Sequence, residues 1–292
     1  MARPAKRARI RLDDVTVCAA DSVSPDLAAR ALEICLAGLD FADAILFSDT
    51  HVAGNFRHVA IDRLKSLDDY SRFCLRDLPR LTSTPFVLLV QWDGYVVEPE
   101  RWSGVFRKYD YVGAPVYEVD GEVWVGNGGF SLRSRKLLDA LPQLTLPAGK
   151  PEDLVICRIN RERLEREFGI NFAPVEIASR FSYEIRHPGR PTFGFHSASN
   201  FWRHLSDAEI VDVFEHLPPR AIAKYPTHLL IVECLSKGRA DVATALYKRA
   251  RTEISVQEMA RQMTRRMPRA AVASIIARLE GGLPLASGGL FD

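Results

Sequence analysis

The segment Phe86–Pro99, FVLLVQWDGYVVEP, decides the fold class of this chain. Its first five residues form an uninterrupted apolar run, which is typical of a strand buried on both faces. The run ends at Gln91, and Asp93 and Gly94 follow at once, so a carboxylate stands where a buried strand emerges. Such a carboxylate is costly unless it is paired, hydrogen-bonded or bound to a cation. The segment therefore predicts a ligand-binding edge, with a turn cap by Asp93 at Gly94 as the alternative.

Strands and helices alternate along the chain before this segment. Strands are expected over Val15–Val23 and Asp43–Thr50, and helices over Ser24–Leu39 and Leu67–Leu81. The first helix has a serine N-cap followed by proline, and both helices have an apolar stripe. This order predicts parallel strands with helices on both faces of a sheet.

Acidic residues follow the apolar residues of three expected strands: Asp21, Asp49 and Asp93. Ligands of open α/β sheets bind beyond the carboxyl ends of the strands, so we expect these three acids to meet at that edge. Several acids at one edge favour a cation or a sugar as ligand over a bare phosphate.

A glycine-rich stretch, Gly126–Lys136 (GNGGFSLRSRK), is expected to be a turn that leads into a helix after Ser131. Its glycines allow a ligand to approach the backbone closely. The P-loop and dinucleotide patterns are absent, so a phosphate-binding loop and a plain turn both stay open.

Three further residues are candidates for chemistry. Glu152 and Asp153 open an expected helix, either as compensation of the helix dipole or as a general base for an acceptor hydroxyl. His196 follows an expected strand over Phe172–Glu184 and is either a core histidine or a ligand of the same metal as Asp93.

Composition limits the class of protein. The 292 residues carry a net charge of +2, so no overall field favours nucleic acid. The five cysteines show no C-x-x-C spacing, which indicates buried thiols in a reducing compartment and not a zinc or redox site. No apolar run is long enough to span a membrane. A cytoplasmic protein is expected.

The chain is expected to comprise a basic flexible arm (1–11), an α/β domain (12–217) and a helical C-terminal region (218–292). Helices are expected in that region over 228–238, 240–250 and 271–279. The basic arm and the cationic segment Lys248–Arg269 are either solvated surfaces or a weak contact with the inner face of an anionic membrane.

The order of these features resembles the nucleotide-sugar glycosyltransferases of the GT-A fold. Four segments are more closely similar to a bacterial family, DUF5672: FVLLVQWDGYVV, YDYVGAPV, VGNGGFSLRSRKLLDAL and PEDLVICR. The resemblance covers Val15–Ser199 and is most specific at Gly126–Lys136. It implies a GT-A-like, Rossmann-type α/β fold, a mixed sheet flanked by helices, with a C-terminal helical appendage.

In GT-A enzymes, a D-x-D motif at a strand end binds the metal and the donor diphosphate. The corresponding stretch here begins with Gln91 and ends with Asp93, so an amide replaces the first acid. The resemblance implies Asp93 and His196 as ligands of Mn²⁺ or Mg²⁺. It also implies that the nucleotide is bound by Gln91, Asp93 and the exit of the first strand, Ala20, Asp21 and Ser22.

The resemblance further implies the catalytic roles. Asp153 would be the base of an inverting transfer, and Glu152 would orient the acceptor. Asn127, Gly128 and Gly129 would line the sugars. A UDP-sugar is the first expectation for the donor, with a GDP-sugar as the alternative. The acceptor would be a glycan, a lipid-linked molecule or a small molecule.

Two other functions are alternatives to sugar transfer. A nucleotidyltransferase would need a glycine-rich, basic loop after the first strand, and VTVCAADSVSPDLAAR has none. A non-catalytic binding module, whose helical tail recruits a partner, is favoured by Gln91 in place of an acid. The presence of both Asp153 and His196 favours the enzyme.

Overall fold

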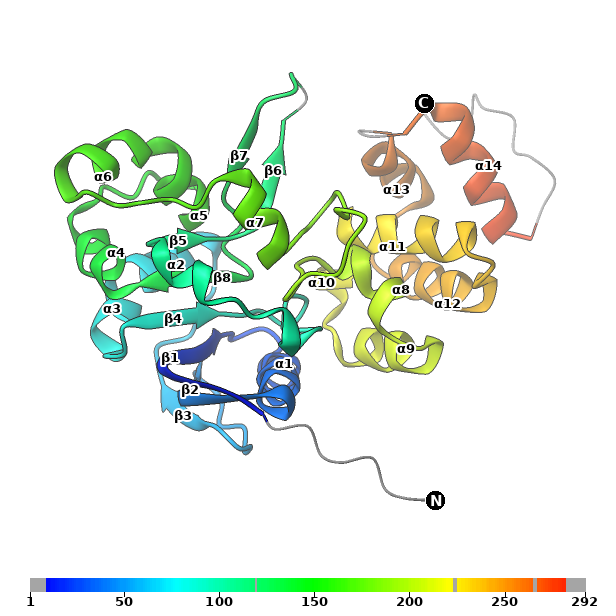
Figure 1. Ribbon diagram of the computed structural model, residues 1–292. Helices are drawn as coiled ribbons and strands as arrows, with labels where there is room; N and C mark the ends of the chain where they lie inside the picture. The colour runs from blue at the N-terminus through cyan, green and yellow to red at the C-terminus, as the bar shows by residue number, and fades with distance from the viewer. Residues whose placement is uncertain (1–8, 119, 223–224, 265–266, 282–292) are drawn as a thin grey trace, which may run out of the picture. The chain divides into compact units, whose positions relative to one another are not determined.

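The first half of the chain forms a six-stranded mixed sheet in the order β3-β2-β1-β4-β8-β5 (Figure 1). Its strands are β1 (Ile10–Ala20), β2 (Leu39–Ser48), β3 (Arg57–Ala60), β4 (Phe86–Leu89), β5 (Tyr111–Val112) and β8 (Ser131–Ser134). Strands β1 to β4 run parallel to one another, whereas β8 runs antiparallel to both β4 and β5. A separate antiparallel hairpin consists of β6 (Pro115–Tyr117) and β7 (Val123–Val125). The expected mixed α/β sheet is confirmed.

Helices cover both faces of this sheet, as expected. They are α1 (Pro25–Gly38), α2 (Leu67–Arg72), α3 (Leu78–Leu81), α4 (Arg135–Ala140), α5 (Glu152–Leu154), α6 (Arg161–Phe168) and α7 (Val175–Phe181). Helix α1 packs against β1 and β2. On the other face, apolar residues of β1, β2 and β4 join those of α2 to α4 in one buried cluster. Continuous apolar runs such as Phe86–Leu89 are therefore used on both faces of the sheet.

The computed structural model describes residues 9–118, 120–222, 225–264 and 267–281. The chain divides into two compact units, Met1–His196 and Ser197–Asp292. The expected boundary lay between 217 and 218, so the helical unit begins earlier than expected. The reason is that α8 (Phe201–His204) and α9 (Asp207–His216) pack with later helices of the tail.

The second unit is helical, as expected. Besides α8 and α9 it contains α10 (Pro219–Ile222), α11 (Tyr225–Ser236), α12 (Ala240–Arg251), α13 (Val256–Met263) and α14 (Arg269–Leu279). Helix α9 begins with a capping box, in which Ser206 and Glu209 exchange side-chain and backbone hydrogen bonds. The helices expected over 228–238, 240–250 and 271–279 are confirmed.

Two expectations of secondary structure are wrong. The segment expected as a strand over Phe172–Glu184 contains helix α7, which begins after Pro174 and buries Ala178 and Phe181. The helix expected after Ser131 is the strand β8, and α4 begins only at Arg135, where the Ser134 side chain accepts from a backbone N–H. Pairing with β4 and β5 overrides the local preference in this segment.

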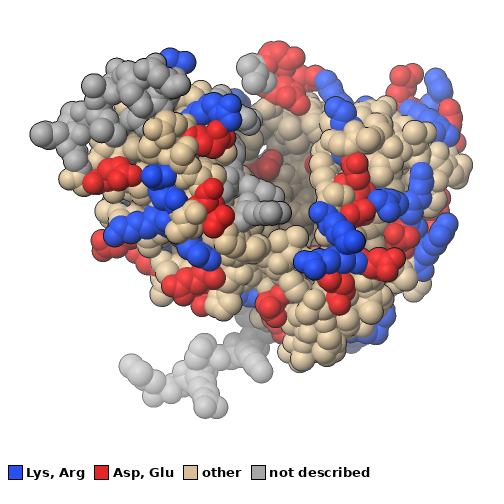
Figure 2. Space-filling view, turned by 180° about the vertical axis from the view of Figure 1, so that it is seen from behind, with Lys and Arg blue, Asp and Glu red and all other residues tan. Residues whose placement is uncertain are grey.

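The basic arm was expected over 1–11. Residues 1–8 lie outside the described part of the chain, and Ile10 and Arg11 belong to β1, where they pair with β2. Basic and acidic side chains are interspersed on the face shown in Figure 2. Within the described residues, no helix is both long and apolar enough to cross a membrane.

One buried histidine of the second unit, His228, should make the free energy of unfolding depend on pH. His228 is fully buried, and neither ring nitrogen has a hydrogen-bond partner among the described residues. Burial disfavours the charged ring and lowers the pKa of His228 to about 4. The unfolded chain, with an ordinary histidine pKa, therefore binds more protons between that value and neutrality. Stability is full above about pH 6.5 and decreases as the pH falls, by about 3 kcal/mol at pH 4.

Urea denaturation as a function of pH measures this effect. The variant His228→Phe should show a shallower loss of stability over the same pH range. His216→Phe is the comparison, because the exposed pair of His216 with Asp212 at 3.6 Å contributes at most about 1 kcal/mol and should change the pH dependence less than His228→Phe does. Equal pH profiles for wild type and His228→Phe would contradict the prediction.

Candidate active site

A cavity of about 370 Å³ lies where β4 ends, in the first unit. It brings together residues from segments far apart in the sequence. Predicted site residues that line it are Gln91, Asn127, Gly128, Gly129, Glu152, Asp153 and His196. The cavity lining also includes five residues that are not among the predicted site residues: Leu67, Tyr70, Val116, Trp124 and Glu184.

Backbone pairing holds His196 in place at the end of the first unit. The N–H of His196 donates to the carbonyl of Tyr183 at 2.9 Å, and the N–H of Gly194 donates to the carbonyl of Phe181 at 2.9 Å. A side chain at Gly194 would overlap the ring of Phe130, so glycine is needed for this close approach. The residues after α7 therefore position both His196 and the neighbouring Glu184.

The imidazole of His196 lies between two carboxylates. Its Nε2 is 3.6 Å from Asp93 Oδ1, and its Nδ1 is 3.6 Å from Glu184 Oε1. Burial alone would disfavour the charged ring, but Asp93 and Glu184 raise the pKa of His196 to about 10. In turn, His196 outweighs the effect of burial on Glu184 and lowers the pKa of that carboxyl. In this Asp93–His196–Glu184 cluster, the two carboxylates thus favour the protonated form of the imidazole.

The amide of Gln91 connects this cluster to Tyr70. Its Oε1 lies 3.1 Å from His196 Nε2, and its Nε2 donates to the hydroxyl of Tyr70 at 2.9 Å. A carboxylate has no N–H to donate, so an acid at position 91 would bond to Tyr70 only if the Tyr70 hydroxyl became the donor. Gln91, which replaces the first acid of the D-x-D pattern, therefore joins Tyr70 to His196.

Asp93 sits in a tight turn, which is consistent with the turn-cap alternative as well. The backbones of Gln91 and Gly94 exchange two hydrogen bonds of 3.0 Å across it. Asp93 is only 8% exposed and is not among the residues that line the cavity. It reaches the cavity through its contact with His196.

Asp21, Asp49 and Asp93 follow the adjacent parallel strands β1, β2 and β4, so they lie at the same edge of the sheet, as expected. Burial raises the pKa of Asp21, and the charges of Asp93 and Asp49 raise it further. Asp21 Oδ1 accepts from the backbone N–H groups of Val23 and Ser24, so it stabilises the turn before α1. Ala20, Asp21 and Ser22 do not line the cavity, and the Ser22 hydroxyl accepts from the backbone of the segment after β3.

Asp153 faces the glycine loop from the start of α5. Its Oδ2 accepts from the N–H of Gly128 at 3.0 Å, and its Oδ1 accepts from the N–H of Leu154 at 2.8 Å. Each carboxylate oxygen keeps a lone pair beyond these bonds. The same loop holds Asn127 at φ +65°, a left-handed conformation that asparagine tolerates well.

Glu152 has a partner that the sequence analysis missed. Its Oε1 lies 2.8 Å from Arg133 Nη2, and the two side chains are 5% and 0% exposed. Burial and the neighbouring Asp153 raise the pKa of Glu152, and Arg133 opposes this. Arg133 lies in the strand β8 and is fully buried, so its charge needs an acidic partner. The sequence predicted a helix in this segment, and the pair with Glu152 was therefore not expected.

The glycine loop does not form the phosphate cradle that the sequence left open. Strand β8 separates Gly129 from the start of α4, so the loop does not lead directly into the N-terminus of α4. Instead, the loop packs closely on other site residues. A methyl group at Gly128 would overlap Glu152 Oε1, and one at Gly129 would overlap the ring of His196.

This packing predicts that Gly129→Ala lowers stability and displaces His196. Overpacking of this kind costs about 1–3 kcal/mol, which denaturant unfolding would measure. Gly104→Ala is the matched control, since nothing lies within 4 Å of its added methyl group. Gly104→Ala should change stability by less than about 0.5 kcal/mol. Equal effects of the two substitutions would contradict the predicted contact.

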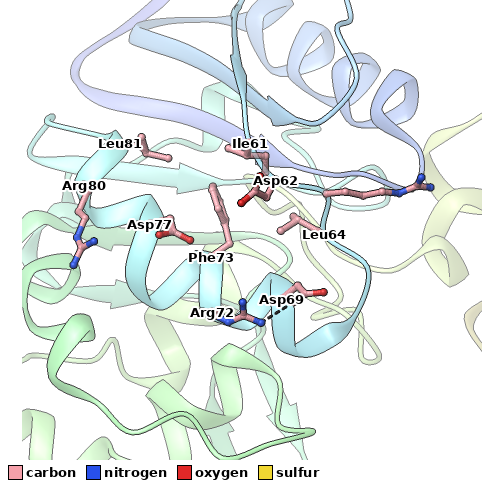
Figure 3. A pocket seen from close by; sticks show the side chains of 10 residues that line it. Ile61, Asp62, Leu64, Asp69, Arg72, Phe73, Asp77, Arg80 and Leu81 are labelled. Atoms are coloured by element: carbon pink, nitrogen blue, oxygen red, sulfur yellow. Dashed lines mark hydrogen bonds and ion pairs between the residues drawn. The ribbon is translucent and has the colours of Figure 1, made fainter.

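A second cavity, of about 300 Å³, lies between the segment after β3 and the helices from α2 to α3 (Figure 3). Phe73 and Leu64 point toward its centre, and an ion pair of 2.6 Å joins Arg72 and Asp69 at its rim. None of the predicted site residues lines it.

Comparison with known proteins supports the resemblance in part. A family model described as "Protein of unknown function (DUF5672)" matches residues 54–196, which confirms the resemblance to that family over this range. The matched range includes every residue that lines the first cavity. No curated protein matches the sequence.

Two solved structures are similar to the chain at low identity. One is a glycosyltransferase involved in the glycosylation of the major capsid of PBCV-1, at 11% identity and a TM-score of 0.42, covering 67% of this chain and 96% of that one. The other is an active-site mutant of LgtC, at 12% identity and a TM-score of 0.41, covering 69% of this chain and 96% of that one. Neither likeness carries an argument about activity.

Proposed function

We propose that this protein transfers a sugar from a nucleoside-diphosphate donor to a hydroxyl acceptor in the 370 Å³ cavity, with inversion at the sugar. One observation carries the proposal. Asp153 and two members of the charged Asp93–His196–Glu184 cluster line the same cavity. A base for the acceptor and a charged partner for the leaving group are the two elements that such a transfer needs.

Asp153 is the proposed base. Its two backbone hydrogen bonds fix the carboxylate on the cavity wall, and the remaining lone pairs can accept the proton of an acceptor hydroxyl. A positioned base of this kind contributes about 10²–10⁴-fold to a rate. Inversion requires that the base and the leaving diphosphate lie on opposite sides of the reacting carbon.

The charged cluster is the proposed partner of the donor diphosphate. Among the described residues that line the cavity there is no lysine or arginine, whereas Glu152, Asp153 and Glu184 are acidic. A diphosphate would therefore need positive charge from a divalent cation, because the carboxylates of Asp93 and Glu184 already balance the charge of His196.

The residues at the cluster fit a divalent metal in their donor chemistry. Mg²⁺ and Mn²⁺ accept carboxylate oxygen and leave other positions to substrate phosphates, and imidazole is a common second ligand. Asp93 and the Nε2 of His196 would hold the ion once the ion had displaced the Nε2 proton, while Glu184 at Nδ1 would orient the neutral ring. Among the described residues, no three His, Cys, Asp or Glu side chains form a metal-binding group, so phosphates would complete the site. When bound, the ion would supply charge neutralisation of the diphosphate.

The nucleotide is proposed to lie toward Ala20, Asp21 and Ser22. These residues are outside the cavity wall, but Asp21 is close enough to Asp93 for their charges to interact. A UDP-sugar remains the first expectation and a GDP-sugar the second, and a cytoplasmic location remains a prediction.

A thermal-shift screen tests this proposal. Each of UDP, GDP, CDP and dTDP is added with Mn²⁺ and, separately, with EDTA. A ligand at about 100 times its Kd stabilises by about 2.7 kcal/mol, which should raise Tm by about 5–10 °C. Asp93→Asn should reduce the shift, whereas Asp62→Asn, in the second cavity, should not.

The outcomes distinguish the alternatives. A shift that requires Mn²⁺ supports the metal at Asp93, and a shift that persists in EDTA removes the metal from the proposal. No shift with any nucleotide would contradict sugar transfer and favour the non-catalytic binding module, in which the helical unit Ser197–Asp292 recruits a partner.

A further inference from the structure

Trp124 lines the cavity but has no role in the steps described above. It lies in β7, directly opposite Val116 of β6 in the antiparallel hairpin. Val116 and the half-exposed Leu67 line the cavity together with it. Part of the cavity lining is therefore apolar and aromatic, and Asp153 belongs to the polar part.

The indole ring of Trp124 is held in one orientation by three contacts. Its Nε1–H donates to Glu118 Oε1 at 2.9 Å, and the guanidinium of Arg158 lies 6.0 Å from the ring centroid. A methyl group at Gly126 would overlap the ring, so the glycine lets the indole lie against the backbone. An aromatic side chain that is already fixed loses little conformational entropy when a ligand covers it.

A hydrogen-bond acceptor in the same cavity lacks a protein donor. The side chain of Asn127 is 4% exposed, and its Oδ1 has no hydrogen-bond partner among the described residues. A buried acceptor without a partner costs about 1–3 kcal/mol, so a ligand that donates to it gains binding energy. Hydroxyl groups are suitable donors, and a phosphate or carboxylate is not.

We infer that Trp124 is the stacking platform for a sugar ring of the acceptor, so that the acceptor is a saccharide. A pyranose has one face of C–H bonds and a rim of hydroxyls. The C–H face carries small positive charges that match the negative face of an aromatic ring. The hydroxyl rim would then donate to Asn127 Oδ1 and to the Asp153 carboxylate.

This inference rests on the proposed sugar transfer. Of the acceptor classes that the sequence left open, it selects the saccharide. A lipid chain would cover the apolar wall and leave Asn127 Oδ1 without a donor. An anionic acceptor would meet the acidic residues of the cavity, where no lysine or arginine is among the described lining residues.

A binding experiment that does not require activity tests the inference. The full chain, labelled with fluorotryptophan, gives one fluorine NMR resonance for each of its four tryptophans. Trp124→Phe identifies the resonance of Trp124. Methyl glucoside, methyl galactoside and methyl mannoside are then titrated to millimolar concentrations, with sorbitol as a control that has hydroxyls but no ring face. We expect the Trp124 resonance to shift saturably with at least one glycoside and not with sorbitol.

Kinetics supply the second readout, once a donor is known. Trp124→Ala should raise KM for the saccharide acceptor by about tenfold, which corresponds to about 1.4 kcal/mol. Hydrolysis of the donor by water should keep its rate. Trp124→Phe should restore most of the acceptor affinity, and Val123→Ala, at the neighbouring exposed position, should have no effect.

The two proposals fail in different ways. A Trp124 shift without any sugar transfer supports the saccharide site and contradicts the transferase. Sugar transfer without a Trp124 shift, or with equal shifts for glycoside and sorbitol, overturns the inference and leaves the transferase standing.

Discussion

Replacing Asp153 by asparagine is expected to lower the rate of sugar transfer by about 10²–10⁴-fold while the donor still binds. The amide has the same shape as the carboxylate but does not accept the proton of the acceptor hydroxyl. It can keep one of the two backbone hydrogen bonds, from Gly128 or from Leu154, so the loop should lose only about 1 kcal/mol of stability. The measurement is kcat for transfer together with the nucleotide-induced change in Tm.

The control for this variant is Asp139→Asn. Asp139 is an exposed residue of α4 whose ion pair with Arg135 is long, at 3.5 Å. It should retain full activity and stability. If Asp153→Asn transfers sugar at the wild-type rate, Asp153 is not the base, whatever its effect on stability.

Removal of Glu152 is expected to be the most destabilising single change at the site. Glu152→Ala leaves the fully buried Arg133 without its 2.8 Å partner, and breaking a buried pair in this way costs about 3–5 kcal/mol. Denaturant unfolding of the full chain measures the loss. An exposed pair, Arg161 and Glu165, supplies the control, because Glu165→Ala should cost less than about 0.5 kcal/mol.

A double substitution distinguishes the pair from simple loss of packing. Glu152→Leu together with Arg133→Met replaces both charges by apolar groups, so no buried charge is left alone, and most of the lost stability should return. Gly128→Ala adds a second check, because its methyl group would overlap Glu152 Oε1. This substitution should lower the stability of the wild type more than that of Glu152→Ala, in which the overlapping oxygen is absent. A cost below about 1 kcal/mol for Glu152→Ala would show that Arg133 finds another partner.

Glu152 and Asp153 show why the roles of site residues were only partly predictable from the sequence. The sequence placed both at the start of a helix and assigned the base to Asp153 and acceptor orientation to Glu152. In the structure, Asp153 holds the glycine loop, and Glu152 pairs with Arg133. The partner comes from a different strand, and no local pattern of residues records such a contact.

The sequence by itself determined the α/β class, the strands β1, β2 and β4, and part of the set of residues that line the cavity at the end of β4. These follow from apolar runs, helix caps and the alternation of elements, which depend on near neighbours in the chain. Only the tertiary structure decided the strand β8, the helix α7, the start of the helical unit at Ser197 and the presence of Trp124 and Asp153 in the lining of one cavity. Each of these depends on pairing or packing between distant segments, which outweighs the weaker local preference.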